Sequence, residues 1–129
     1  LHTFKFVAAD GAVKYGRLDW DPVAGVRPHG TCVDDEFLHE ELRERLKRGP
    51  IRFVLRLNIA SQGDALDDPT IQWDTTRQRV VLGEAWITEL AGDEGDGCEH
   101  LSFNPTRLAP GVECSEDPVL AARRGAYEY

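Results

Sequence analysis

The most regular hydrophobic pattern in the chain is an alternation over residues 51–60. Every second side chain there is apolar, and this set consists of Ile51, Phe53, Leu55, Leu57 and Ile59. Because successive side chains of a strand point to opposite faces, the alternation predicts a half-buried β-strand. Residues 79–90 are apolar on both faces, which predicts a further strand that is buried within a sheet.

The N-terminal residues predict a β-hairpin. Residues 3–9 and 12–20 form two extended stretches, and Asp10-Gly11 between them supplies the positive backbone angles of a tight turn. Alternate side chains of the first arm share one face, which we expect to point toward a core rather than into water. That face consists of His2, Phe4 and Phe6.

A middle helix is predicted between the second and third strands. Asp34 and Asp35 can cap its N-terminus, and it runs to about Arg48, where Gly49-Pro50 ends it. An apolar stripe lies opposite a face of Glu and Arg side chains. That stripe consists of Phe37, Leu38, Leu42 and Leu46.

A second helix is predicted to begin near Pro118. Asp117 stands at its N-cap and Pro118 at its first helical position, and both residue types are favoured there. Four antiparallel strands, a middle helix and a terminal helix make an α+β pattern rich in β-structure. A chain of 129 residues is most simply one domain, so we treat residues 1–129 as a single unit.

Composition and charge exclude several classes of partner. The net charge is −8, from 23 acidic and 15 basic residues. Because that average field repels polyanions, we expect neither nucleic acid nor an acidic membrane surface as a partner. No apolar run approaches the ~18–20 residues that cross a bilayer. The acidic segment 91–99 is interpreted as a surface loop, since its carboxylates lack the regular spacing of a calcium site.

The cysteines and the missing methionine bear on the origin of the chain. Cys32, Cys98 and Cys114 form no C-x-x-C pair, which argues against a disulfide framework and a zinc site and predicts free thiols. The sequence contains no methionine, so we expect a processed product or an excised piece of a longer protein. Its compartment stays open between cytoplasm and periplasm.

The terminal helix carries the candidate chemistry. Arg123 and Tyr127 are four residues apart, a spacing that stacks a guanidinium against a phenol one turn away. An adjacent positive charge favours the phenolate, and a phenolate is a hard anionic ligand suited to ferric haem iron. Ala122 and Ala126 would let a flat macrocycle approach the helix closely. On the residues alone, the same Arg/Tyr pair is also ordinary surface packing.

Several short motifs occur in order along the chain. They are H-T-F-K at 2–5, L-S-F-N-P at 101–105, P-G-V-E at 110–113 and D-x-x-L-x-x-R-x-x-x-Y at 117–127. This order resembles the haem catalase superfamily, and the resemblance spans essentially the whole chain. The segment D-P-T-I-Q-W at 68–73 resembles the small catalase-related peroxidases more closely than the large tetrameric catalases.

The resemblance implies the second half of an antiparallel β-barrel of the haem-dependent catalase type, with a C-terminal helix that binds haem b. Tyr127 matches the proximal ligand of the haem iron, and Arg123 matches the arginine that holds this tyrosine ionised. His2 matches a strand histidine that hydrogen-bonds the arginine, and Asp117 matches the carboxylate that completes the relay. Ala126 would lie against the haem. From the residues alone, His2 could instead be a core histidine and Asp117 only a helix cap.

The implied activity is haem-dependent decomposition of hydrogen peroxide or organic peroxides. Two alternatives stay open: rearrangement of fatty-acid hydroperoxides by a catalase-fold enzyme, and a non-catalytic β-barrel that binds an apolar ligand. The family's distal histidine and asparagine lie in the first half of the fold, so His29, His39 and His100 are not assigned to that role. We expect the chain to need its missing N-terminal half or an oligomeric partner, and to be inactive alone.

Overall fold

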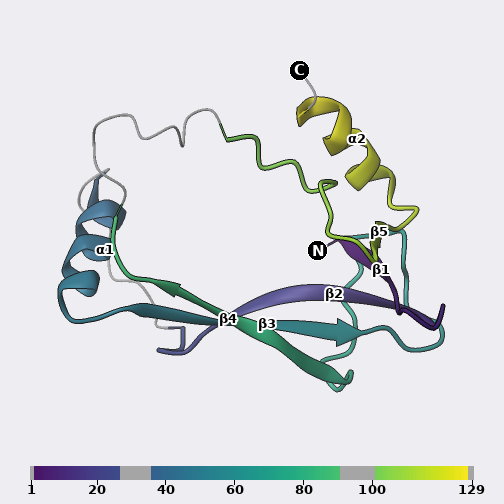
Figure 1. The fold of residues 1–129 in the computed structure, drawn as a ribbon, viewed down its shortest axis with the longest axis horizontal. Coiled ribbons are helices and arrows are strands. Elements are labelled where there is room, and N and C mark those ends of the chain that lie inside the picture. The colour runs from purple at the N-terminus through teal and green to yellow at the C-terminus, as the bar shows by residue number, and fades with distance from the viewer. Residues whose placement is uncertain (1, 27–35, 91–100, 128–129) are drawn as a thin grey trace.

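The computed structural model describes residues 2–26, 36–90 and 101–127 (Figure 1). The elements are β1 (Thr3–Val7), β2 (Val13–Pro22), α1 (Phe37–Lys47), β3 (Ile51–Ile59), β4 (Arg79–Ile87), β5 (Val112–Cys114) and α2 (Pro118–Tyr127). The predicted hairpin, the two further long strands and both helices are confirmed, with small differences at their ends. The proposed caps Asp34 and Asp35 lie outside the described residues, as does the acidic segment 91–99.

The strands form one antiparallel sheet in the order β4-β3-β2-β1-β5. The β1–β2 connection turns at Asp10-Gly11, as predicted. Gly11 has a φ of 83°, a left-handed conformation that glycine adopts without steric cost. The Asp10 carboxylate accepts a hydrogen bond of 2.9 Å from the backbone N–H of Ala12, which tightens the turn.

The strand register separates an apolar face of the sheet from a polar one. Cross-strand neighbours on one face are apolar, as in the row Leu18, Leu57 and Val80. The opposite face carries charged and amide side chains, as in the row Arg17, Asn58 and Arg79. Alternation along each strand therefore produces the half-buried sheet that the sequence predicts.

A glycine is required at position 16 because the Leu57 side chain lies close to the backbone there. Gly16 pairs with Phe4 on one side and Ile59 on the other. A Cβ atom at this position would overlap Leu57 Cδ1. The missing side chain therefore lets Leu57 pack directly onto the backbone of β2, where it is 8% exposed.

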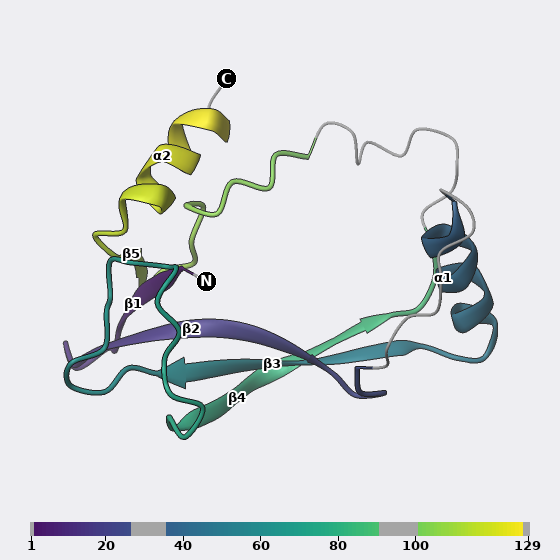
Figure 2. The same cartoon turned by 180° about the vertical axis from the view of Figure 1, so that it is seen from behind.

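The two helices stand at opposite ends of the sheet, on the same side of the strands in both views (Figures 1 and 2). In α2, Leu120 is completely buried. In α1 no side chain is buried, so the predicted apolar stripe does not pack into a core among the described residues. Leu38, one of its members, is 64% exposed. The stripe is only partly covered, since Phe37, Leu42 and Leu46 are half-buried.

One expectation about the sheet needs correction. The segment of β4 was expected to be buried, but β4 is an edge strand, and Val81, Leu82 and Trp86 are each about half exposed. Closure of the implied barrel is not seen among the described residues, since β4 and β5 lie at opposite edges of an open sheet. An open sheet agrees with the expectation that these strands form only half of a barrel.

The short strand β5 was not predicted as a strand. It pairs with β1 through Phe4↔Cys114, Lys5↔Glu113 and Phe6↔Val112. A three-residue strand has no resolvable period, which explains why the pattern of apolar residues did not indicate it. Its role is to bring the chain back alongside β1 immediately before α2 begins.

Candidate functional site

The corner where β1 meets α2 is the most tightly buried part of the described chain. The largest fully buried side chains are Leu120, Thr3 and Asp117, and all three belong to this corner. Two of the three are polar, so they must find hydrogen-bond partners within the protein. The predicted residues His2, Asp117, Arg123 and Tyr127 lie on these same two segments.

Asp117 builds the start of α2. Its Oδ1 accepts hydrogen bonds from the backbone N–H groups of Val119 at 2.8 Å and Leu120 at 3.2 Å. These donors have no partner inside the helix, so the carboxylate satisfies them as an N-cap. Pro118 occupies the first helical position, where the absence of an N–H costs nothing. Both halves of the predicted start signal are confirmed.

The second oxygen of Asp117 binds His2. His2 Nδ1 lies 2.6 Å from Asp117 Oδ2, across 115 positions of sequence. Burial alone would raise the pKa of Asp117, but hydrogen bonds from His2 and from the Leu120 and Val119 amides outweigh it and lower the pKa. Asp117 is therefore an ionised carboxylate with each oxygen committed to a different partner.

The partners of His2 fix its protonation and tautomer. Arg123 Nη1 lies 3.1 Å from His2 Nε2. Because a guanidinium has only N–H donors, Nε2 must accept and the ring proton must sit on Nδ1, from which it is donated to Asp117. An imidazolium would place an N–H donor against the guanidinium. The geometry thus specifies a neutral His2 in the Nδ1–H form.

Arg123 connects this pair to Tyr127. Its Nη2 donates to the Tyr127 hydroxyl at 3.4 Å, and its guanidinium carbon lies 5.7 Å from the centre of the phenol ring. The four-residue spacing therefore brings the two groups together as predicted. Tyr127 remains 37% exposed. We call the set His2, Asp117, Arg123 and Tyr127 the relay.

Exposed apolar surface flanks the outer end of the relay. Ser102 Oγ donates to the backbone carbonyl of Tyr127 at 3.4 Å, which holds segment 101–103 beside the last turn of α2. Within that segment Leu101 is 57% and Phe103 is 74% exposed, and Ala126 on the helix is exposed as well. A large apolar group would bury this surface.

Asn104 orders the segment that carries Phe103. Its Oδ1 accepts from the Thr106 backbone N–H at 2.9 Å and from the Thr106 hydroxyl at 2.7 Å. This side-chain turn leaves Asn104 only 8% exposed. Leu101 and Phe103 were not singled out from the sequence as site residues. The exposure of an apolar side chain cannot be read from its type, although the motif containing them was noted.

Among the described residues, His39 and Cys114 are not part of the relay. His39 lies on α1, where its side chain is 69% exposed and bonds Glu36 at 2.9 Å. His29, His100, Cys32 and Cys98 lie outside the described residues. Cys114, in β5, is an exposed free thiol, as expected. Within the described parts of the chain no group of three or more His, Cys, Asp or Glu side chains could hold a metal ion.

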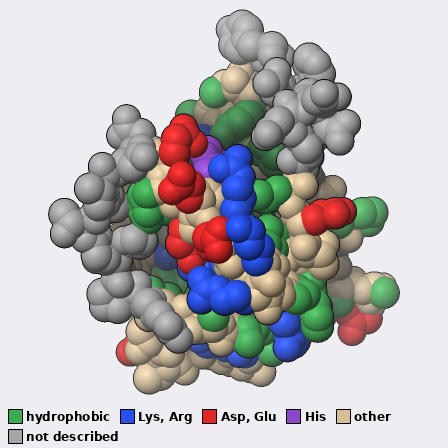
Figure 3. Space-filling model, turned by 90° about the vertical axis from the view of Figure 1, so that its left-hand side faces the viewer, with side chains coloured by type: hydrophobic (Ala, Val, Ile, Leu, Met, Phe, Trp, Pro, Cys, Tyr) green, Lys and Arg blue, Asp and Glu red, His purple; other side chains and the backbone are tan. Residues whose placement is uncertain are grey.

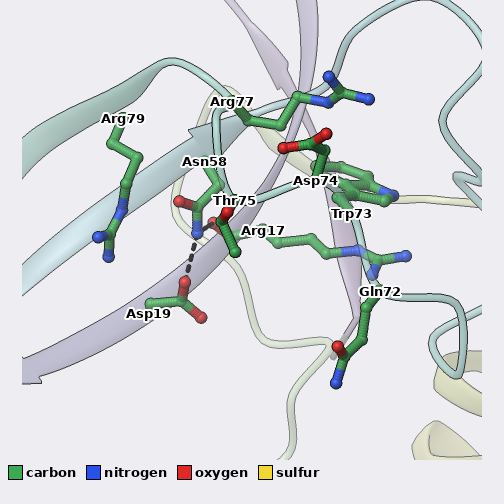
Figure 4. A pocket seen from close by; sticks show the side chains of 9 residues that line it. All are labelled: Arg17, Asp19, Asn58, Gln72, Trp73, Asp74, Thr75, Arg77 and Arg79. Carbon is green, nitrogen blue, oxygen red and sulfur yellow. Dashed lines mark hydrogen bonds between the residues drawn. The ribbon is translucent and has the colours of Figure 1, made fainter.

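A cavity of ≈ 370 Å³ lies on the polar face of the sheet, lined by strand residues and by the loop between β3 and β4 (Figure 4). Asn58 donates to Asp19 within it, and the Arg17 guanidinium stacks 4.2 Å from the centre of the Trp73 ring. Two of the arginines that line it bond carboxylates just outside the lining. Arg77 forms a two-point pair with Asp64, and Arg79 bonds Asp21.

The fold is that of the catalases. Over 98% of the chain the structure superposes on a fungal catalase with a TM-score of 0.85 at 20% identity, covering 28% of that chain. Catalase A from Saccharomyces cerevisiae superposes with a TM-score of 0.85 at 19% identity, covering 29% of its chain. The five-stranded sheet with its two helices is therefore a segment of the catalase fold.

Sequence comparison gives the family. Catalase-related peroxidases of Mycolicibacterium paratuberculosis and Synechococcus elongatus are 36% and 31% identical to the chain, in each case over 98% of it. The chain spans 42% and 39% of these two relatives. No family model matches it. The chain belongs to the catalase superfamily. Within the described residues no helix is long and apolar enough to span a bilayer.

Proposed function

We propose that this chain supplies the proximal side of a haem b site in an enzyme that decomposes hydrogen peroxide or organic peroxides. The observation that carries the proposal is the unbroken set of hydrogen bonds from the N-cap of α2 through His2 and Arg123 to the Tyr127 hydroxyl. The names of the two peroxidase relatives support the same reaction class.

Each member of the relay has a distinct task in this proposal. Tyr127 holds the haem iron through its phenolate oxygen. Arg123 places a fixed positive charge beside that oxygen and stabilises the phenolate. His2 holds Arg123 in place by accepting its N–H at Nε2 and keeps its own proton at Nδ1. Asp117 fixes the tautomer of His2 and ties the relay to the start of the helix.

The chemistry of the donor set fits haem. Bound haem would supply the iron that reacts with peroxide, and an anionic tyrosine is a suitable ligand for ferric haem iron. The methyl side chain of Ala126 projects little from the helix, which would leave space for a flat ring beside Tyr127. Leu101 and Phe103 supply exposed apolar area nearby. These residues would hold the macrocycle, while the relay sets the charge on the oxygen that binds the iron.

The proposed enzyme contains more than the described sheet. We propose that residues 1–129 are the C-terminal half of a catalase-like core, and that an N-terminal half supplies the distal residues. The open edge at β4, with its half-exposed Val81, Leu82 and Trp86, supports a further layer at that edge. A homo-oligomer could cover the same surface, and size measurement of the protein would distinguish the two.

The test is the absorption spectrum, with ferric haem, of the parent-length polypeptide that includes the proposed N-terminal half, compared with its Tyr127→Phe variant. Tyr127→Phe is expected to abolish the bands of a tyrosinate-ligated haem. Tyr15→Phe is a matched control, because Tyr15 lies on β2 opposite Lys5 and away from the relay. Unchanged spectra in Tyr127→Phe would mean that another residue binds the iron. Absence of haem uptake in every variant would contradict the proposal altogether.

A second measurement sharpens the substrate class. Turnover of hydrogen peroxide and of a fatty-acid hydroperoxide should be compared in the same preparation. Decomposition of hydrogen peroxide is expected to dominate. Rearrangement of the lipid hydroperoxide without loss of hydrogen peroxide would instead indicate the isomerising enzymes.

A further inference from the structure

Arg17, on β2, is a buried cation whose hydrogen bonds all go to neutral oxygens. It is 6% exposed. Nη1 donates to the carbonyl of Ile71 at 2.6 Å, and Nη2 donates to the carbonyls of Ala65 and Asp68 at 3.1 and 3.0 Å. Figure 4 shows its side chain extending from the strand toward Trp73 and Gln72. The guanidinium therefore binds the backbone of one loop at three points.

Burying the charge of Arg17 costs free energy, so the surrounding groups must stabilise it. Burial lowers the pKa of Arg17, and the carboxylates of Asp64 and Asp117 act most strongly against that effect. A buried ion that finds only carbonyl dipoles is stable only if its geometry is well satisfied. Three carbonyls and the face of Trp73 supply that geometry.

The fourth hydrogen bond of Arg17 leads to the relay. Its Nε donates to Thr3 Oγ1 at 3.1 Å, and Thr3 is 1% exposed. Thr3 pairs with Arg17 in the β1–β2 register and directly follows His2 in sequence. The side chain of Thr3 is thus fixed on one face of β1, while His2 reaches Asp117 and Arg123 from the neighbouring position.

We propose that Arg17 is a positioning residue for the relay: through Thr3 it sets the backbone from which His2 reaches Asp117 and Arg123, and it anchors that backbone to the loop over residues 65–71. Among the described residues, Arg17 makes no hydrogen bond to any of the four relay side chains. Its hydrogen-bonded link to them is the Thr3 hydroxyl. The relevance of this inference to catalysis rests on the proposed function. The geometry that it predicts for His2 does not.

Thr3→Val tests the link most directly, because it removes the hydroxyl and keeps the shape of the side chain. The readout is the pair of imidazole nitrogen resonances of His2 in the intact chain without haem. In the parent chain, Nδ1 should appear protonated and Nε2 unprotonated. In Thr3→Val the two resonances should move toward each other, as the Nδ1–H form loses its exclusive population. Thr3→Ser keeps the hydroxyl and should resemble the parent chain.

Arg17 itself is tested by Arg17→Lys and Arg17→Met, read by the same resonances and by amide hydrogen exchange over residues 65–71. Exchange in the loop should become about tenfold faster or more in both variants, since a lysine cannot reproduce the fork that binds three carbonyls. Arg79→Met is the matched control. Arg79 lies on the same sheet face, and its guanidinium bonds Asp21 rather than the loop over residues 65–71, so both readouts should stay unchanged.

The outcomes separate this inference from the proposed function. Faster loop exchange with unaltered His2 resonances in Thr3→Val and both Arg17 variants would make Arg17 a loop anchor only and overturn the inference. A shift in Thr3→Ser equal to that in Thr3→Val would also overturn it, by assigning the effect to packing. Shifted His2 resonances together with a haem spectrum insensitive to Tyr127→Phe would support the Arg17 link while contradicting the proximal haem role.

Discussion

The two helices have similar lengths and opposite ways of being held. α1 has 11 residues and α2 has 10. α1 buries no side chain, and its N-cap Glu36 makes no capping hydrogen bond through its side chain. α2 begins at a carboxylate that caps two amides and anchors itself with the fully buried Leu120. The position of α2 is therefore fixed by buried contacts with the rest of the protein, whereas the described side chains of α1 remain at least partly exposed.

The difference shows what fixes a functional side chain in place. Acidic and basic side chains gather side by side over the α1 end of the molecule (Figure 3). Pairs such as Glu41–Arg45 join neighbours on the same helix and do not orient it against the sheet. Asp117 joins α2 to β1 through His2. A set of side chains that must keep its geometry is therefore expected on a helix that, like α2, is bonded to the sheet.

The largest expected effect is that of Leu120→Ala. Removing a fully buried leucine side chain leaves a cavity at the corner and should lower the free energy of unfolding by about 3–4 kcal/mol. Leu38→Ala makes the same change on α1, where the side chain is 64% exposed. Its effect should stay within about 0.5 kcal/mol. Denaturant unfolding measures both, and equal losses would contradict the contrast between the helices.

Asp117→Ala should rank second. The variant loses the N-cap of α2 and leaves His2 Nδ1 without its acceptor, so we expect a loss of about 2–3 kcal/mol. Asp117→Asn keeps a capping oxygen and should lose about 1 kcal/mol. Glu36→Ala, at the matching position of α1, should change stability less than either. A Glu36 effect as large as that of Asp117→Ala would remove the distinction.

Acid titration sharpens the same prediction. The ordinary pKa of the Asp117 carboxyl is 3.8, and the folded protein lowers it. A lowered carboxyl pKa contributes stability that is fully present above the ordinary value and is lost as the pH falls through the folded value. The stability advantage of the parent over Asp117→Asn should therefore shrink below about pH 4. An advantage that persists unchanged at lower pH would show that the charge of Asp117 contributes nothing.

Local sequence patterns predicted the helices and strands well, but they did not predict what packs against each of them. The alternation at β3 and the Asp10-Gly11 turn depend on neighbouring residues, so they could be read from the sequence. The start of α2 at Asp117-Pro118 was predictable for the same reason. The exposure of α1 and the edge position of β4 depend on what packs against them. An apolar stripe shows that a face can be buried but not which partner buries it.

The relay was predictable in part, because its motifs resemble those of a known family. Arg123 and Tyr127 share a helix, so their contact follows from spacing alone. The contact between His2 and Asp117 spans 115 positions and needs the fold to bring β1 beside α2. Arg17 was not singled out. An arginine in a strand is usually exposed, and its burial against three carbonyls has no signature in sequence.

The smallest expected effect is that of Glu41→Gln on α1. Glu41 Oε1 accepts from Arg45 Nε at 2.8 Å and Nη2 at 2.6 Å, across one helical turn. Because both side chains are more than one-third exposed, solvent screens the pair, and its loss should cost about 0.3–0.5 kcal/mol. The cost should vanish in about 1 M salt, where the Debye length is roughly 3 Å.

A larger or salt-independent loss of unfolding free energy in Glu41→Gln would contradict the contrast between α1 and α2. It would mean that an exposed charge pair within α1 stabilises the protein as strongly as the buried carboxylate of α2 does. Circular dichroism during unfolding, recorded at low and high salt, distinguishes these outcomes. If Glu41→Gln instead behaves as expected while Asp117→Asn keeps most of its effect in salt, the buried carboxylate is the group that fixes helix orientation in this fold, because screening by mobile ions reaches exposed pairs and largely spares buried ones.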